Sequence, residues 1–205
     1  SDVSKNICTQ GTYSKYENEE ITDIKVDLMS QILDRLEISY EEFFYIKNDY
    51  SMSLHEKIIH NFYNQSYNNL NNLLQLKKDC LTYLNDFPND ELIININTAL
   101  EGLIFLSETE DFEGARKIVK PIWTNLSNRG DLFMADIYLL NSILFIFPLS
   151  TAKNMKLFAF RQIEKYGYFK KIYRLKINFL MNLTLLLIGE NEFKEALDHI
   201  EESIT

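Results

Sequence analysis

The segment from Thr9 to Asn18, TQGTYSKYEN, carries side chains that can contact nucleic-acid bases. Glutamine can pair with the edge of adenine through two hydrogen bonds, and lysine can donate to guanine or to a phosphate. Gln10 and Lys15 are the residues of these types in the segment. Gly11 lacks a side chain and would let a DNA strand approach the backbone closely. A helix that begins here would therefore offer its first turn as a surface for reading DNA.

Thr9 is the residue expected to start this helix, because threonine is a favoured N-cap. Tyr13 and Tyr16 would form the inward face of the helix, which leaves the polar residues of its first turns outside. The expected DNA-binding residues are Thr9, Gln10, Gly11, Thr12, Ser14, Lys15 and Asn18.

Short helices joined by tight turns are expected around this segment, over residues 1–45. Ser1 can cap a first helix over SDVSKNI, which has apolar residues four positions apart. A later helix is expected from about residue 25 to residue 36. Ser39 and Glu42 have the spacing of a capping box and predict one more short helix.

The string SDVSKNICTQGTYSKYENEE, followed by a Leu- and Met-rich helix and then by LEISYEEFF, resembles the Cro/C1-type (XRE) helix-turn-helix. Three linked elements over about 45 residues carry the resemblance. It implies a DNA-binding head in which the helix after Thr9 is the recognition helix. The first helix of the usual five is absent and Glu19 stands where the family often has Gly, so the expected head is a partial one.

Longer helices are expected from about residue 53 onward. Their expected ranges are 53–65, 67–84, 90–107, 111–128, 131–146, 150–166, 171–188 and 191–203. The segments EDFEGARKIV and NEFKEALDHI share an aromatic residue, a small residue three positions later, and then an apolar anchor. Weaker copies extend the series. In the four copies, the residue three positions after the first one is Leu70, Ala115, Met155 and Ala196. Their spacing of 40–45 residues suits stacked helical hairpins, although any amphipathic helix can produce the weaker copies by chance.

A head followed by helical repeats resembles the Rgg/MutR type of peptide-responsive transcriptional regulator. DLFMADIYLLNSILFIF at 131–147 and FLMNLTLLLIGENEFKEAL at 179–197 carry this second resemblance. It implies a partial helix-turn-helix domain over 1–45, a linker over 46–52 and a TPR-like right-handed superhelix of stacked hairpins over 53–205. It further implies a homodimer that binds double-stranded promoter DNA with its heads and a short signalling peptide in the concave face of its repeats.

Asparagines in the expected first helices of the hairpins are candidates for holding such a peptide. An Asn side chain both donates and accepts, so it can hold the main chain of an extended peptide. A guanidinium group, as in Arg174, suits a peptide carboxylate. The expected peptide-binding residues are Asn97, Tyr138, Asn141, Arg174, Asn178 and Asn182. Because Asn is abundant throughout the chain, a solvated or capping role stays open for each Asn.

The stretch from residue 153 to residue 176 is the basic part of an acidic chain. It holds eight basic residues and one acidic residue, whereas residues 177–205 hold one basic and six acidic residues. Its aromatic residues are expected to pack within the hairpin. Three roles stay open for its cations: solvation, pairing with acidic helices of a partner subunit, and binding a peptide carboxylate.

Composition favours an all-α protein that acts in the cytoplasm. Six Gly and three Pro in 205 residues leave few turns for an all-β fold. The longest apolar runs are interrupted by Asn, Ser or Thr, so no membrane span is expected. Only two cysteines, Cys8 and Cys80, occur, and a reduced compartment is the simpler interpretation.

An enzyme is not expected, and neither is a metal or another cofactor. The three histidines, His55, His60 and His199, are scattered, and each is interpreted as a surface or structural residue. Two of them have a glutamate four residues before them, but further ligands are missing nearby. The sequence contains no GxSxG, no Gly-rich phosphate loop and no CxxC motif.

Charge favours an alternative to DNA binding. Residues 1–52 hold five basic and 11 acidic residues, and affinity for DNA depends largely on contacts between cations and phosphates. The alternative function is a helical-repeat scaffold for protein partners, with a degenerate head that does not bind DNA.

Overall fold

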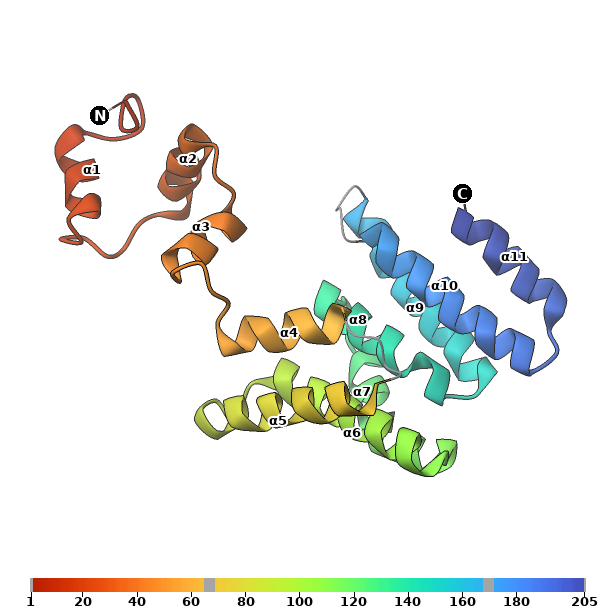
Figure 1. Cartoon of the computed structure of the whole chain (residues 1–205). Coiled ribbons are helices and arrows are strands. Elements are labelled where there is room, and N and C mark those ends of the chain that lie inside the picture. Colours follow the sequence, from red (N-terminus) through yellow and green to blue (C-terminus); the bar gives the residue numbers. More distant parts are fainter. Residues whose placement is uncertain (1, 65–68, 168–171, 205) are drawn as a thin grey trace. The chain divides into compact units, whose positions relative to one another are not determined.

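The computed structural model of the chain describes residues 2–64, 69–167 and 172–204. In these ranges the regular secondary structure consists of 11 α-helices and one 3-10 helix, with no strand (Figure 1). The all-α class expected from the composition is therefore confirmed. The chain divides into two compact units, Ser1–Ser53 and Leu54–Thr205.

The first unit contains three short helices, α1 (Gln10–Glu17), α2 (Val26–Leu36) and α3 (Tyr40–Lys47). The expected caps start two of them. The Thr9 hydroxyl accepts a hydrogen bond from the Thr12 amide at 3.1 Å, and the Ser39 hydroxyl accepts from the Glu42 amide at 3.0 Å. Each bond satisfies an amide that lacks a partner within its own helix. α3 also occupies the first two residues of the segment that was expected to be a linker.

The expected helix over SDVSKNI is wrong, because residues 2–7 form turns. Asn6 adopts the left-handed conformation with φ 64°, which interrupts the helical path after a single turn. One turn of helix does not repay its own nucleation cost. The turns are instead fixed to α2, where the Arg35 guanidinium donates to the carbonyl of Asp2 at 2.7 Å.

The second unit is a series of helical hairpins. Its elements are α4 (Leu54–Asn64), α5 (Leu70–Asp86), α6 (Glu91–Thr109), α7 (Phe112–Ser127), α8 (Met134–Ile143), η1 (Leu144–Ile146), α9 (Leu149–Tyr166), α10 (Ile172–Gly189) and α11 (Phe193–Ile204). Each first helix packs against its second helix, and α4, α6, α8 and α10 also contact one another in sequence order. We call these four first helices the inner row.

The repeated motif marks how the hairpins pack. Its small residues, Ala115 and Ala196, are buried, whereas its aromatic residues, Phe112 and Phe193, are 49% and 60% exposed. The small side chains therefore provide the helix–helix contact. In the weaker copy formed by Tyr67 and Leu70, Tyr67 lies outside the described residues, whereas Leu70 begins α5.

Gly102 shows how close two paired helices come. A Cβ atom at this position of α6 would lie 2.3 Å from Cγ1 of Val119 in α7. Since Val119 is fully buried, it has little room to move, and only glycine fits between the two helices.

α10 is the one helix among the described residues that is long and apolar enough to cross a membrane. Its buried side chains include Leu175, Phe179 and Leu183, which belong to the hydrophobic core of the hairpins. Packing against α8, α9 and α11 thus accounts for part of the apolar character of this helix.

Candidate functional site

α1 presents the first turn that the sequence predicts for DNA contact. Gln10, Gly11 and Lys15 are exposed, and nothing lies within 4 Å of the position that a Cβ atom of Gly11 would take. A ligand backbone could therefore approach Gly11 closely. The Gln10 Oε1 atom accepts a hydrogen bond from the buried Ser4 hydroxyl at 3.0 Å. That bond orients the carboxamide and occupies part of its bonding capacity.

The other residues of the predicted DNA-binding set form local contacts on the same helix. The hydroxyls of Thr9 and Thr12 lie 2.8 Å apart, in addition to the capping bond. The Asn18 amide donates to the Ser14 hydroxyl at 3.4 Å near the end of α1. These side chains shape the helix ends, while Gln10 and Lys15 remain the residues on α1 suited to contacting bases.

Glu19 occupies the position at which the helix-turn-helix motif often has glycine. Its φ is 57°, in the left-handed region that favours glycine. Its amide donates to the carbonyl of Tyr16, as the chain leaves α1. The backbone therefore keeps the conformation that explains glycine in the motif, although the side chain is different.

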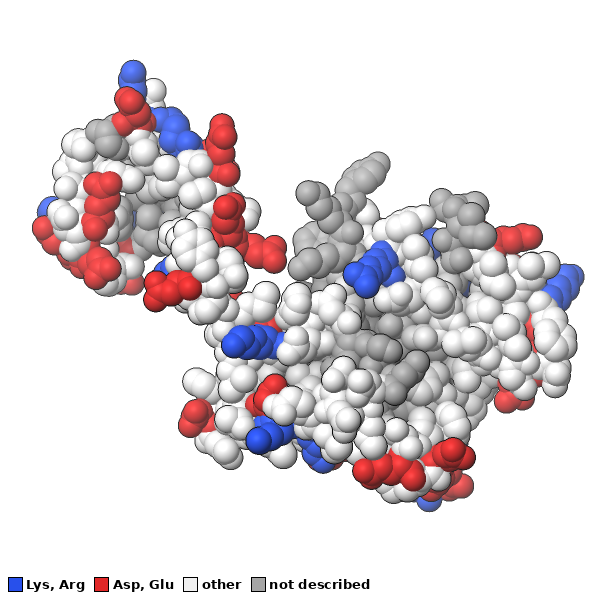
Figure 2. Space-filling view, viewed as in Figure 1, with Lys and Arg blue, Asp and Glu red and all other residues white. Residues whose placement is uncertain are grey.

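The surface of the first unit is predominantly acidic (Figure 2). Red Asp and Glu side chains outnumber blue Lys and Arg side chains on the face shown. Such a surface repels phosphates, so any DNA contact depends on the few cations near α1.

The inner row brings four of the six predicted peptide-binding residues together. Asn182 in α10 donates from its amide to the backbone carbonyl and the side-chain oxygen of Asn141 in α8, at 3.2 and 3.1 Å. Tyr138 lies one turn before Asn141, and Arg174 lies two turns before Asn182. The pKa of Tyr138 is raised by burial, and the nearby charge of Arg174 opposes this shift. Residues from α8 and α10 thus share one surface.

Tyr63 is a neighbour of this surface that the sequence did not predict. It lies near the end of α4, and its ring stacks on Tyr138, with ring centres 3.8 Å apart and planes 13° from parallel. Burial raises the pKa of Tyr63, so the phenol stays protonated at neutral pH. The spacing between the two tyrosines gives no signal for this pairing, because it joins separate hairpins.

Asn97 belongs to the same row but has a different set of contacts. Its amide donates to Glu101 at 3.2 Å, and Glu101 pairs with Lys77 at 3.2 Å. The Oδ1 atom of Asn97 is buried without a hydrogen-bond partner among the described residues. It is an acceptor that a bound amide could satisfy.

α10 also exposes apolar residues that the sequence interpretation missed. Arg174, Asn178, Met181, Leu185 and Ile188 recur at spacings of four and three residues, so they lie on one face, which we call the α10 face. Met181 and Leu185 are 57% and 68% exposed. The α10 face therefore has a cationic end and an apolar end. The spacing of four and three residues could have revealed this face, but no prediction was made from it.

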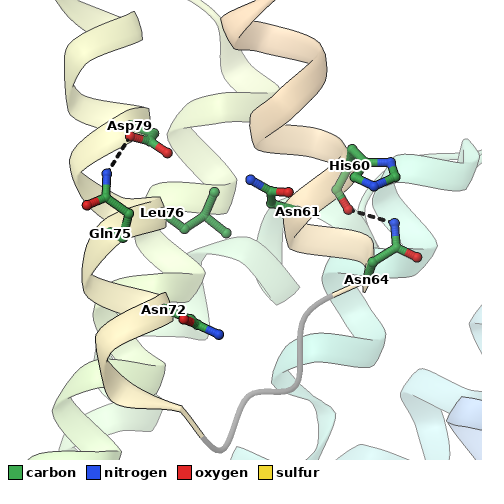
Figure 3. Close-up of a pocket in the computed structure, with 7 residues that line it drawn as sticks. All are labelled: His60, Asn61, Asn64, Asn72, Gln75, Leu76 and Asp79. Atoms are coloured by element: carbon green, nitrogen blue, oxygen red, sulfur yellow. Dashed lines mark hydrogen bonds between the residues drawn. The ribbon is translucent and has the colours of Figure 1, made fainter. Parts of the chain in front are cut away.

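A carboxamide-rich pocket lies between α4 and α5 (Figure 3). His60, Asn61, Asn64, Asn72, Gln75, Leu76 and Asp79 line this space of about 310 Å³. The Gln75 amide donates to Asp79 at 2.9 Å, and the Asn64 amide donates to the carbonyl of His60 at 2.8 Å. Carboxamides of this kind can pair with the donors and acceptors of a polar ligand.

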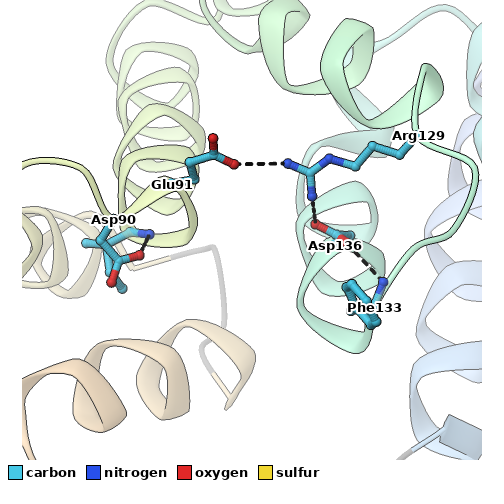
Figure 4. A network of polar contacts seen from close by, with 6 residues as sticks. Asp90, Glu91, Arg129, Phe133 and Asp136 are labelled. Carbon is cyan, nitrogen blue, oxygen red and sulfur yellow. Dashed lines mark hydrogen bonds and ion pairs between the residues drawn. The ribbon is translucent and has the colours of Figure 1, made fainter.

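A polar cluster joins the beginnings of α6 and α8 (Figure 4). Arg129 donates to the buried carboxylate of Asp136 at 3.0 Å and pairs with the exposed Glu91 at 3.4 Å. The other carboxylate oxygen of Asp136 accepts from the Phe133 amide at 2.9 Å, which starts α8. The cluster fixes two helices of the inner row at their N-terminal ends.

The cations of the basic stretch pair largely within the chain. Lys153 pairs with Glu195, and Lys156 pairs with Glu202 at 3.0 Å. Other pairs join Lys165 to Asp131 and Lys176 to Glu202. The acidic helix α11 thus neutralises part of the basic stretch. Phe158, Phe160 and Tyr166 pack against the hydrophobic core as expected, whereas Tyr173 is 55% exposed, so the prediction is wrong for that residue. Tyr168 and Phe169 lie outside the described residues.

The histidines lie apart in the structure. His55 forms a contact with Asp90 at 3.3 Å, and His60 is exposed. His199 is buried beside Lys156, with 3.3 Å between Nε2 and Nζ. Among the described residues, no group of three His, Cys, Asp or Glu side chains is placed to hold a metal ion.

Comparison with solved structures identifies a similar fold. A crystal structure from Listeria monocytogenes EGD-e, described as a candidate transcriptional regulator, superposes with a TM-score of 0.74. The fold is shared with that protein. The match covers 98% of this chain and 68% of the Listeria chain, at 18% sequence identity. No family model and no curated protein matches the sequence.

The similarity therefore establishes the fold, and the chemistry of individual residues must support any function. It covers nearly the whole of this chain, so it includes the three short helices as well as the hairpins. At 18% identity, the match shows the fold alone.

Proposed function

We propose that the chain is a cytoplasmic, non-enzymatic transcriptional regulator that binds double-stranded DNA through α1. The observation that carries this proposal is the capped first turn of α1, which exposes Gln10, Gly11 and Lys15. The left-handed Glu19 at the motif's glycine position supports it. The fold shared with a candidate regulator across both units adds further support.

Selection from a random pool of DNA duplexes tests this proposal without knowledge of the operator. The intact protein should enrich a defined sequence motif over several rounds at low salt, because base contacts discriminate by about 1–3 kcal/mol per pair. If the protein enriches no sequence motif more than a control with beads alone does, the proposal that it binds specific DNA sequences is contradicted.

We also propose that the inner row senses a short peptide with apolar side chains and one carboxylate. The α10 face supports this proposal, since Arg174 lies at one end and exposed Met181 and Leu185 lie at the other. The Oδ1 atom of Asn97, which has no hydrogen-bond partner within the described ranges, offers an acceptor for a peptide amide. Asn141 is buried and bonded to Asn182, so these two residues fix the surface and contact a peptide less directly.

Calorimetry with short, apolar, singly acidic peptides encoded next to the gene tests the peptide proposal. Arg174→Ala should weaken binding by about tenfold, because one charge-assisted contact to a carboxylate is lost. Arg161→Ala is the matched control, since Arg161 is an exposed arginine of the same basic stretch on α9. No heat of binding across the set, or equal losses in both variants, would reject the peptide site while leaving the DNA role intact.

A homodimer completes the proposal. Two heads double the number of DNA contacts, which would compensate for an acidic surface. Sedimentation of the intact chain at micromolar concentration measures the mass directly. A monomer, with or without DNA, would contradict the dimer.

The acidic head supports one alternative function, a helical-repeat scaffold for protein partners. The net charge of residues 1–52 is one observation in its favour. The other is the bond from Ser4 to Gln10, which reduces the capacity of Gln10 to form hydrogen bonds with a base. Under this alternative, DNA selection fails while the hairpins still bind a protein. The two functions are therefore distinguished by the DNA experiment.

A further inference from the structure

The pocket between α4 and α5 contains none of the residues proposed to bind DNA or a peptide (Figure 3). Its lining comes from one side of each helix, because residues three and four positions apart share a helix face. α4 contributes His60, Asn61 and Asn64, and α5 contributes Asn72, Gln75, Leu76 and Asp79. The pocket is therefore formed by the two helices of one hairpin.

Two carboxamides, those of Asn61 and Asn72, face this space from opposite helices. In Figure 3, Asn61 projects from α4 toward Leu76, and Asn72 projects from α5 one turn before Leu76. Within the described ranges, neither of these two side chains forms a hydrogen bond. A carboxamide has two N–H donors and one acceptor oxygen. Donors and acceptors are thus offered from both sides of the pocket.

The other polar side chains of the lining add acceptors. The Asn64 amide donates to the carbonyl of His60 at 2.8 Å, and the Gln75 amide donates to Asp79 at 2.9 Å. These bonds use the amide nitrogens, so the side-chain oxygens of Asn64 and Gln75 remain as acceptors in the part of the chain that the structure describes. A hydroxyl group both donates and accepts, so it can pair with either end of a carboxamide.

The lining excludes ligands that need a charge or a large apolar contact. It contains neither Lys nor Arg to pair with a phosphate or a carboxylate, and Lys57, one turn before Asn61, lies outside it. It also contains no Phe, Tyr or Trp on which a base could stack. Leu76 is its one apolar residue and is only 3% exposed. A volume of about 310 Å³ suits a small molecule that is polar over most of its surface.

We propose that the pocket between α4 and α5 binds a neutral sugar or polyol. Asn61 and Asn72 bind its hydroxyl groups from opposite sides, and the Gln75 oxygen accepts from a further hydroxyl. The site shares no residue with the DNA-binding set of α1 or with the α10 face, so its failure and the failure of those proposals are separate results.

Nuclear magnetic resonance of the intact, nitrogen-15-labelled chain tests the proposal. The probes are D-glucose, D-galactose, D-ribose and D-mannitol. The side-chain amide signals of Asn61 and Asn72, each assigned through its loss in the alanine variant, should shift and saturate with at least one probe. Half-saturation is expected at about 1–10 mM, because so small a ligand forms few contacts. Inorganic phosphate, putrescine and the neutral diamide N-acetylglycinamide should all bind more weakly than the best of these probes.

Substitutions locate the binding in the pocket. Asn61→Ala and Asn72→Ala, each followed at the amide signal of the other asparagine, should weaken binding about fivefold or more, because hydrogen bonds to hydroxyls are lost. Asn71→Ala is the matched control and should change binding less than about twofold, since Asn71 is exposed beside Asn72 but lies outside the lining. An unchanged circular dichroism melt in all three variants shows that lost binding does not reflect unfolding.

Three results would overturn the proposal. One is the absence of saturation by every sugar and polyol up to about 50 mM. Another is binding of phosphate, putrescine or the diamide that is as tight as that of the best sugar or polyol. The third is a loss in Asn71→Ala equal to the losses in Asn61→Ala and Asn72→Ala.

Discussion

Asn182 of α10 and Asn141 of α8 are joined by two hydrogen bonds. The Asn182 amide donates to both the backbone carbonyl and the side-chain oxygen of Asn141, which is only 5% exposed. Asn182, which was predicted to bind a peptide, thus forms hydrogen bonds to the neighbouring helix. The bonds set the register of the two helices that carry the predicted peptide surface.

Asn182→Ala should destabilise the hairpins by about 1–3 kcal/mol, because it leaves two acceptors of the buried Asn141 unsatisfied. Urea denaturation followed by circular dichroism measures the loss. Asn178→Ala, on the same helix, is the control and should change stability by less than about 0.5 kcal/mol. Equal effects of the two substitutions would show that the pair does not stabilise the fold.

Arg129→Ala should destabilise the second unit by about 2–3 kcal/mol, since it leaves the buried carboxylate of Asp136 without its cation. The other partner of Arg129, Glu91, has a side chain that is 81% exposed. Glu91→Gln should therefore change stability by less than about 0.5 kcal/mol. Thermal unfolding of both variants checks the contrast, and a larger loss in Glu91→Gln would contradict it.

Glu19→Gly should stabilise the first unit by about 1 kcal/mol, because the left-handed backbone at φ 57° is strained for a side chain. Glu17→Gly, two residues earlier within α1, should instead destabilise it by about 0.5–1 kcal/mol. Native-state hydrogen exchange of the α1 and α2 amides measures both changes. Loss of protection in Glu19→Gly would show that the side chain matters more than the backbone strain.

The stability of the second unit should fall as the pH decreases from about 7 to about 5, partly because of His199. Burial lowers the pKa of His199, and Lys156 and Lys153 lower it further, while Glu195 and Glu202 partly oppose them. Below its ordinary pKa of about 6.5, the imidazole takes up a proton more readily in the unfolded chain than in the folded one. Protonation therefore favours unfolding over this range.

Urea denaturation at several pH values, with His199→Gln as the comparison, isolates this contribution. The variant should lose less stability between about pH 7 and pH 5 than the wild type does. His60→Gln, which changes an exposed histidine on α4, should follow the wild type. Identical profiles of wild type and His199→Gln would contradict the assignment.

Much of the fold follows from local sequence signals. Thr9 and Ser39 were predicted to cap helices, and both do so, because an N-cap depends on residues within three positions. The small residues of the repeat, Ala115 and Ala196, mark buried contacts. The helix over SDVSKNI could not be excluded in the same way, since the bond from Arg35 of α2 to the carbonyl of Asp2 joins residues 33 positions apart.

The contacts that define the surfaces join distant residues and could not be derived from spacing. Lys153 pairs with Glu195, 42 residues later, although the opposite charges of the two segments gave a hint. No signal in the sequence indicated that Tyr63 stacks on Tyr138. Gln10 was correctly placed on an exposed first turn of α1, but its bond to Ser4 required the folded head.

The central claim is that α1 reads DNA, and one titration tests it most directly. Fluorescence anisotropy of the selected duplex should show that Gln10→Ala with Lys15→Ala weakens binding by about a hundredfold, because a base contact and a cation are both lost. Lys25→Ala, which removes an exposed cation of the same unit outside α1, should weaken it by less than about tenfold. Unchanged binding in the double variant, or an equal loss in Lys25→Ala, would contradict the account.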